Sequence, residues 1–375
     1  MTAGLHAQTP KRPPLWLVMA MLAAALVVGA SGTLLVSYLR GPSASATPTG
    51  PPPVLTVVST SPSGDGAASG SSIAVRFSTD LASGTPLPTL APAIAGNWAV
   101  LSPSLLEYRS AGPLVPGSAE TLTIPGGAGG VVGSRGQHLA STVTDTFTVA
   151  SGSTLRLQQL LAELGYLPLD FTAATPVTSP TQEADDQVGT FTWRWPDQAL
   201  ALTSSWVPGT YNVVTKGAVM SFEAQHGLKT DGLPGPQVWS DLLGDVQSGQ
   251  GDALPYDYVV VSQALPQTAT VYDNGASVFK TLVSTGVAAA PTENGTWPVY
   301  LRYTVTTMSG TNPDGSKYVD PGIPWVSYFH GGDALHGFIR SSYGFPQSVG
   351  CVEIPPANAK VIYPLTPIGT LVTVQ

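Results

Sequence analysis

The sequence contains one cysteine, Cys351, and a histidine, His336, lies fifteen residues before it. A cysteine attacks a carbonyl as the thiolate, and an imidazole within hydrogen-bonding reach can accept the thiol proton and hold it for the leaving group. Gly350 directly precedes the cysteine and permits close approach of the backbone, so consecutive N–H groups there could line an oxyanion hole. This pattern predicts acyl transfer by a cysteine nucleophile. A buried, unreactive thiol is the alternative, and spacing alone does not decide between the two.

The composition restricts the other chemistry that is open to the chain. Its 375 residues include 15 Lys and Arg against 23 Asp and Glu, a formal net charge of −8, which argues against a nucleic-acid-binding surface. One cysteine excludes an intrachain disulfide and a cysteine-cluster metal site, and no H-E-x-x-H, P-loop or G-x-G-x-x-G pattern is present. We therefore expect no metal, no other cofactor and no nucleic-acid partner.

Residues 16–39 are apolar and uncharged over 24 positions, whereas a helix needs about 20 residues to span a bilayer. Basic residues on the N-terminal side favour a cytoplasmic N-terminus. We predict a cytoplasmic segment at 1–15, a single-pass membrane anchor at 16–39 and a proline-rich linker at 40–53. A signal peptide cleaved near Ala46 is the alternative and would give a secreted protein. In both cases the later domains lie in the periplasm or the cell wall.

Residues 54–150 contain short runs in which apolar and polar side chains alternate, for example Ile73, Val75 and Phe77. Several such runs separated by turn sequences predict a β-sandwich. The segment resembles bacterial Ig-like domains and shows no constellation of reactive side chains. We interpret it as a spacer or adhesion domain.

Residues 151–250 change to a helical pattern. A first helix is predicted to end at Gly165, a second to begin with Thr215 as its N-cap, and a third to open at Gly235-Pro236. The segment resembles the three-helix peptidoglycan-binding domain. The matching residues are Leu157, Gln158, Leu161, Leu164, Gly165, Tyr166, Thr215, Ala218, Val219, Phe222, His226, Gly227, Leu228, Asp231, Gly232, Gly235, Pro236, Trp239 and Leu242.

An insertion at about 170–210 separates the first two predicted helices and contains Trp193, Trp195 and Trp206. Tryptophan rings can stack on the faces of sugars, although core packing is their more common role. Both interpretations stay open.

Residues 256–375 return to a β pattern and contain the Cys351 region. The segment resembles the L,D-transpeptidase (YkuD-like) catalytic domain. The matching stretches are Leu335-His336-Gly337, Ser348-Val349-Gly350-Cys351-Val352, Pro291-Thr292, Gly295-Thr296-Trp297-Pro298-Val299, Asn358-Ala359 and Gly369-Thr370-Leu371-Val372. The resemblance implies that Cys351 forms an acyl-enzyme, that His336 is the general base and that the Gly337 carbonyl orients the imidazole. It also implies 3→3 cross-linking of peptidoglycan stem peptides, as donor and acceptor, and inhibition by carbapenem β-lactams.

Two positions depart from the family pattern. Val349 stands where the family has histidine, and Glu353 stands where it has arginine. The first change could alter the oxyanion hole or the acceptor site, and the second places an anion near the thiol, which raises a thiol pKa if it faces the sulfur. These departures keep two alternatives open: a non-catalytic peptidoglycan-binding scaffold, or an L,D-carboxypeptidase that gives the acyl group to water.

Further residues are candidates for substrate contact. Tyr318, Trp325 and Tyr328 fall where the family has a lid, and packing against the sheet is the alternative. Ser348 is expected to position the loop or bond the substrate, and Arg340 to pair with a stem-peptide carboxylate. In total, we predict a mainly β chain with an N-terminal transmembrane helix, an Ig-like sandwich at 54–150, a small three-helix module at 151–250 and a β-rich catalytic domain at 256–375.

Overall fold

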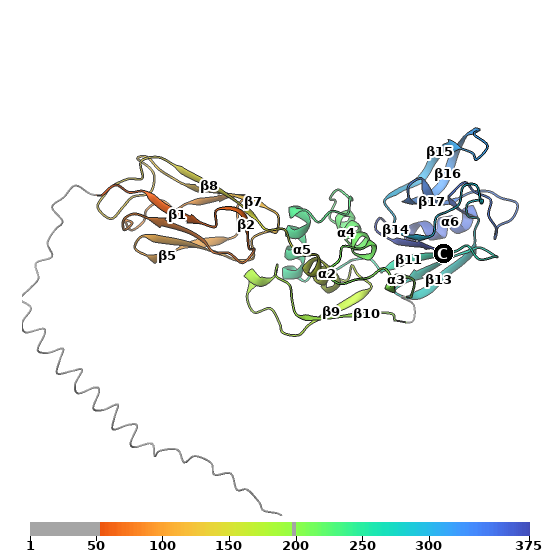
Figure 1. Ribbon diagram of the computed structural model, residues 1–375, viewed down its shortest axis with the longest axis horizontal. Coiled ribbons are helices and arrows are strands. Elements are labelled where there is room, and N and C mark those ends of the chain that lie inside the picture. Colours follow the sequence, from red (N-terminus) through yellow and green to blue (C-terminus); the bar gives the residue numbers. More distant parts are fainter. Residues whose placement is uncertain (1–52, 197–199) are drawn as a thin grey trace, which may run out of the picture. The chain divides into compact units, whose positions relative to one another are not determined.

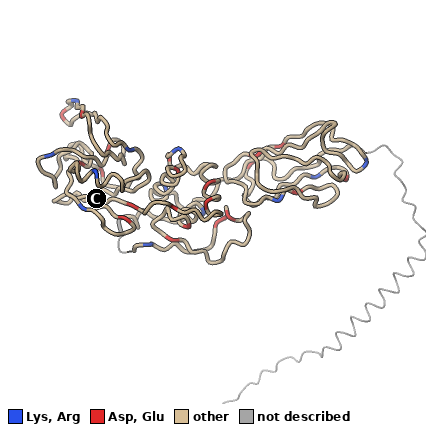
Figure 2. The backbone as a smooth tube through the Cα atoms, turned by 180° about the vertical axis from the view of Figure 1, so that it is seen from behind, with Lys and Arg blue, Asp and Glu red and all other residues tan. Residues whose placement is uncertain are grey.

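The structure, a computed structural model, describes residues 53–196 and 200–375 (Figure 1). The predicted anchor at 16–39 and nearly all of the linker lie outside these residues. Within the two described ranges, no helix is both long enough and apolar enough to cross a membrane. Charged residues are sparse, and the positions of Lys and Arg are scattered along the described chain (Figure 2).

The first described segment forms two four-stranded sheets, in the orders β1-β3-β6-β5 and β2-β8-β7-β4. The alternation predicted from sequence is seen in β3, where Ile73, Val75 and Phe77 are buried and Arg76 is exposed. The strands are β1 (Val57–Ser61), β2 (Gly64–Ala67), β3 (Ile73–Phe77), β4 (Thr89–Ala91), β5 (Gly96–Ser102), β6 (Leu105–Ser110), β7 (Ala119–Ile124) and β8 (Val143–Val149).

Three longer helices follow: α2 (Thr154–Glu163), α4 (Val213–Gln225) and α5 (Pro236–Ser248). The predicted N-cap at Thr215 is wrong. The helix begins two residues earlier, and Asn212 Oδ1 accepts a hydrogen bond from the Thr215 N–H at 3.0 Å. The β-branched pair at 213–214 obscured this start, because such residues favour strands. The predicted opening of α5 is confirmed, with Gly235 as the N-cap and proline in the first turn.

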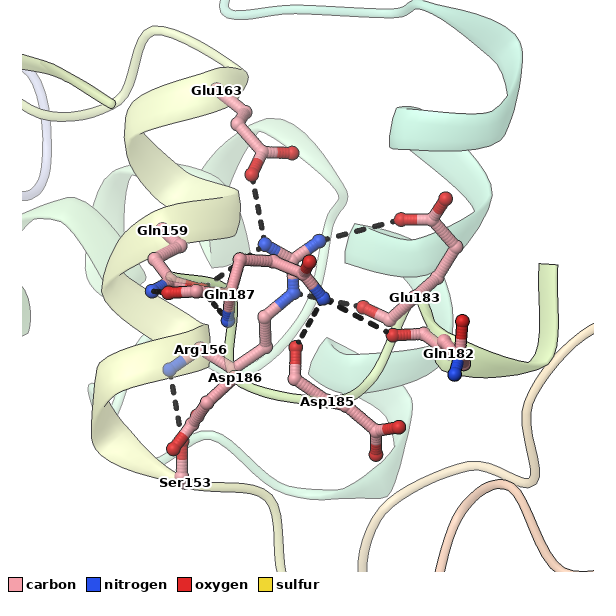
Figure 3. Close-up of polar contacts among 9 residues, drawn as sticks. All are labelled: Ser153, Arg156, Gln159, Glu163, Gln182, Glu183, Asp185, Asp186 and Gln187. Atoms are coloured by element: carbon pink, nitrogen blue, oxygen red, sulfur yellow. Dashed lines mark hydrogen bonds and ion pairs between the residues drawn. The ribbon is translucent and has the colours of Figure 1, made fainter. Parts of the chain in front are cut away.

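Between α2 and α4 lies the insertion, which contains an antiparallel pair, β9 (Leu169–Ala173) and β10 (Gly189–Trp193), together with η1 (Pro180–Gln182) and α3 (Leu200–Thr203). A buried arginine of α2, Arg156, fastens this insertion (Figure 3). Its guanidinium donates to Glu163 Oε1 at 2.8 Å and to the Glu183 carbonyl at 2.8 Å, and it pairs with Glu183 Oε2 at 3.4 Å. A buried charge is tolerated only with such partners, so this cluster fixes the insertion against α2.

The helical module also contains a buried carboxyl group, Glu223 of α4, which is 1% exposed. Its Oε2 accepts a hydrogen bond from the Gly232 N–H at 2.8 Å, and burial raises its pKa to about 7. Because the folded pKa lies above the unfolded value, the stability linked to this proton is complete below about pH 4.3 and is lost as the pH rises through 7.

We therefore expect the melting temperature to fall less between pH 5 and pH 8 in the Glu223→Gln variant than in the parent protein. Glutamine keeps an acceptor for the Gly232 N–H but cannot ionise. Thermal melts at the two pH values check this. Asp241→Asn, at a less buried carboxylate of α5, is the matched control and is expected to leave the parent's pH dependence in place. An unchanged pH dependence in Glu223→Gln would contradict the assignment.

The last segment forms two sheets that share one core. A five-stranded sheet has the order β13-β12-β11-β19-β14, and a four-stranded sheet has the order β15-β16-β17-β18. Residues 297–305 belong to two strands that lie in different sheets. The elements are β11 (Asp257–Ser262), β12 (Thr268–Asp273), β13 (Ala276–Leu282), β14 (Gly295–Pro298), β15 (Leu301–Thr311), β16 (Lys317–His330), β17 (Asp333–Gly337), β18 (Val352–Ile354), α6 (Pro356–Ile362), η2 (Tyr363–Leu365) and β19 (Leu371–Val374).

Candidate active site

His336 and Cys351 are brought together by β17 and β18, which run parallel. In this register Leu335 pairs with Val352, so Cys351, one residue earlier, lies beside Ala334. The Ala334 N–H donates a hydrogen bond to the cysteine sulfur. The thiol and the imidazole therefore come from neighbouring positions on adjacent strands.

The His336 side chain is 3% exposed, and its Nδ1 lies 3.2 Å from the Gly337 carbonyl oxygen. A ring nitrogen that faces a carbonyl carries the hydrogen, so the other nitrogen, Nε2, keeps its lone pair. Burial lowers the pKa of His336, while the Gly337 carbonyl and Glu353 oppose that shift. The histidine is thus neutral at pH 7 and can accept a proton.

Cys351 is partly buried, and desolvation, with smaller contributions from Asp333 and Glu353, raises the pKa of its thiol to about 12. Its Sγ also lies 3.8 Å from the Gly332 carbonyl oxygen, an acceptor that suits a protonated thiol. The resting group is therefore the thiol rather than a thiolate–imidazolium pair. Reaction with a carbonyl requires removal of the proton when the substrate binds.

The turn before Cys351 is held by hydroxyl groups. The Ser348 hydroxyl donates to the Cys351 carbonyl and accepts from the Gly350 N–H at 3.3 Å. Thr292 Oγ1 donates to the Gly350 carbonyl at 2.6 Å. Ser348 therefore acts within the loop, and the Gly350 N–H is already engaged rather than free for an oxyanion. Val349 is half-buried in the same turn.

Gly350 has φ of +123°, a conformation that other residues rarely adopt. A Cβ on this residue would lie 2.3 Å from Asp333 Oδ1, so the turn packs closely on that carboxyl group. Burial raises the pKa of Asp333 to about 6. Glycine is thus required at position 350 both by the backbone conformation and by the closeness of the Asp333 carboxyl group.

Arg340 and Glu353 form a two-point ion pair. Arg340 Nε lies 2.7 Å from Glu353 Oε2, and Nη2 lies 2.7 Å from Oε1, while Nη2 also donates to the Gln347 carbonyl at 3.2 Å. Glu353 is 5% exposed. The guanidinium is therefore occupied, which favours a positioning role for Arg340 over the predicted contact with a substrate carboxylate. The negative charge of Glu353, which stands where the family has arginine, is thus paired with Arg340.

Three tyrosines lie within electrostatic range of the thiol. Burial raises the pKa of Tyr300, Tyr318 and Tyr328, and the charge of a Cys351 thiolate raises each further. Trp325 is elsewhere: it has φ of +56°, and its ring packs on that of Tyr363 at a centroid distance of 5.6 Å. Of the three predicted lid aromatics, Tyr318 and Tyr328 thus lie within reach of the thiol's charge, and Trp325 packs on Tyr363.

Some residues of the site were not singled out for these roles from sequence. Tyr300 follows directly after the quoted stretch ending at Val299, and Thr292 lies within a quoted stretch, so their position in the motif was the available signal. Across the described residues, no group of three or more His, Cys, Asp or Glu side chains is arranged to hold a metal ion.

A cysteine directly before β18 and a neutral histidine on the adjacent strand β17 form a pair of the kind that can transfer an acyl group through a thiol. Residues 256–374 match the family model of the YkuD L,D-transpeptidase catalytic domain, so this segment is a domain of that family. The match leaves the preceding 255 residues outside the family model.

Solved structures of L,D-transpeptidases are also similar. One from Mycobacterium smegmatis is 14% identical over 86% of this chain and 100% of its own, with a TM-score of 0.29. L,D-transpeptidase 3 from Mycobacterium tuberculosis is 13% identical over 85% and 98%, with a TM-score of 0.30. The catalytic domain from E. faecium, acylated by ertapenem, is 25% identical over 33% and 100%, with a TM-score of 0.29. No curated protein matches the sequence.

Proposed function

We propose that this protein is an L,D-transpeptidase that forms 3→3 cross-links between peptidoglycan stem peptides through a Cys351 acyl-enzyme. The observation that carries the proposal is the parallel pairing of β17 with β18, which brings the neutral His336, oriented by the Gly337 carbonyl, to the strand next to the protonated thiol. The match of residues 256–374 to the family supports it. The apolar stretch at 16–39 supports a membrane anchor that holds the catalytic domain outside the cytoplasm.

The reaction has two steps, acylation of Cys351 by the donor stem and transfer of the acyl group to the acceptor stem. His336 Nε2 takes the thiol proton as Cys351 Sγ attacks the carbonyl of the third residue of the donor stem, and the imidazolium then protonates the departing amine of the terminal D-Ala. A thioester remains on the enzyme. The amine of an acceptor stem attacks this thioester, its proton passes to His336, and the cysteine leaves as the free thiol.

Intact-mass spectrometry with ertapenem tests the proposal, because a carbapenem traps an acyl-forming thiol. The parent protein is expected to gain one covalent adduct, and Cys351→Ala is expected to gain none. Incubation with a tetrapeptide stem donor should then give cross-linked dimers. Shortened monomers without dimers would indicate an L,D-carboxypeptidase. A folded parent protein that forms no adduct with either compound would overturn the proposed acyl-enzyme and favour the scaffold.

A further inference from the structure

The insertion of the helical module contains an open groove that is separate from the cysteine site. Its volume is about 420 Å³, within the usual range for small-ligand sites. One wall is the β9–β10 pair, in which Phe171 lies opposite Phe191 and Leu169 lies opposite Trp193. Trp206, from the segment before α4, completes the lining on the other side.

The aromatic rings of this groove form a continuous row. The ring centroids of Phe171 and Phe191 are 5.0 Å apart, and those of Phe191 and Trp206 are 5.3 Å apart in an edge-to-face arrangement. Gly189 allows the row to form, because a Cβ there would lie 2.4 Å from the Phe171 ring. All four rings, including that of Trp193, are only partly buried, so they present apolar surface to the groove as well as packing on the core.

The groove is held in shape before any ligand arrives. Gln159 and Gln187 exchange two hydrogen bonds: Gln159 Nε2 donates to the Gln187 carbonyl at 2.8 Å, and the Gln187 N–H donates to Gln159 Oε1 at 3.0 Å. The buried Arg156 and its partner Glu183 anchor the same segment (Figure 3). A preformed site avoids the entropy cost of ordering on binding.

The lining identifies the class of ligand. It contains aromatic rings, the half-buried amide of Gln187 and the exposed hydroxyl of Thr190, but no Lys, Arg, Asp or Glu; the Gln159 amide beneath it is buried and bonded to Gln187. Asp185 and Asp186 lie in the adjoining loop, and their charge would repel anionic polymers. Pyranose rings present C–H faces that pack on aromatic rings and hydroxyl edges that bond to amides. We propose that this groove binds a glycan strand of uncharged pyranose units.

The proposal stands apart from the transpeptidase chemistry and can fail while that chemistry holds. The probe is tetra-N-acetylchitotetraose, a soluble chain of four uncharged N-acetylglucosamine units, titrated into the full chain by calorimetry. We expect the parent protein to bind it and Trp206→Ala to bind at least tenfold more weakly. Ertapenem adduct formation in the same Trp206→Ala preparation shows that the catalytic domain is intact.

Trp195→Ala is the matched control, because this tryptophan lies in the same insertion but outside the groove. Its ring stacks under the Arg194 guanidinium at 4.3 Å and lies 6.1 Å from the Tyr256 ring. It should bind the probe as the parent does. Absence of binding to the parent protein, undiminished binding to Trp206→Ala, or equal losses in both tryptophan variants would each overturn the proposal. A circular dichroism spectrum of each variant identifies any loss caused by unfolding of the helices.

Discussion

Replacement of His336 by glutamine is expected to slow acylation of Cys351 by ertapenem by about two to four orders of magnitude, the usual contribution of a positioned general base. The thiol pKa of about 12 explains the size of the effect. At pH 7 the thiol therefore stays protonated on its own, so the rate depends on a neighbour that removes the proton. Glutamine fills similar space but cannot accept that proton. Stopped-flow or quenched mass measurements give the rate.

The pH dependence separates loss of the base from general damage to the site. In the parent protein the rate should rise with pH through the lowered pKa of His336, below 6.5, and then stay level to pH 9, because the thiol itself titrates far higher. In His336→Gln it should instead climb about tenfold per pH unit up to pH 9, as free thiolate becomes the reacting form. Parallel profiles for the two proteins would contradict a base role.

His138→Gln provides the control for histidine replacement. His138 is exposed on the N-terminal sandwich, whose core is separate from that of the site residues. Its replacement should leave both the rate and the profile unchanged.

The sequence predicted the elements whose signals are local. The alternation of apolar and polar residues predicted β3 and its buried face, and Gly235-Pro236 predicted the start of α5. It also identified Cys351 and His336 as candidates, because a single cysteine after a glycine and a histidine fifteen residues before it can be recognised without knowledge of the fold. The start of α4 was missed, because the β-branched residues at 213 and 214 favour strands and so obscured the N-cap at Asn212.

Contacts across long sequence separations could not be predicted from local pattern. Thr292 lies 58 residues from the Gly350 carbonyl that it binds, and nothing in its neighbourhood indicates that partner. Sequence likewise could not separate the tryptophans of the insertion. Trp193 and Trp206 line the groove whereas Trp195 packs on Tyr256, a division that depends on how the insertion folds. The reactive pair Cys351 and His336 could therefore be predicted from sequence, whereas the residues that hold it in place could not.

Replacement of Arg340 by methionine is expected to destabilise the protein by about 3–5 kcal/mol, because it leaves Glu353 buried without its cation. Methionine keeps much of the side-chain volume, so the effect reports the charge rather than a cavity. The double variant Arg340→Met/Glu353→Gln removes both charges and should recover much of the loss. A double-mutant cycle of thermal or denaturant unfolding measures the coupling.

The same pair tunes the base, and the two single variants should move it in opposite directions. Glu353 raises the pKa of His336, and Arg340 lowers it. Arg340→Met should therefore shift the acid limb of the acylation profile to higher pH, and Glu353→Gln should shift it to lower pH, because each removes one of two opposing fields. If the Arg340–Glu353 pair only holds the loop together, both variants should acylate more slowly, with the acid limb of the profile at the same pH as in the parent protein. Shifts in the same direction would likewise show that the charges of Arg340 and Glu353 do not act on His336 as their geometry requires.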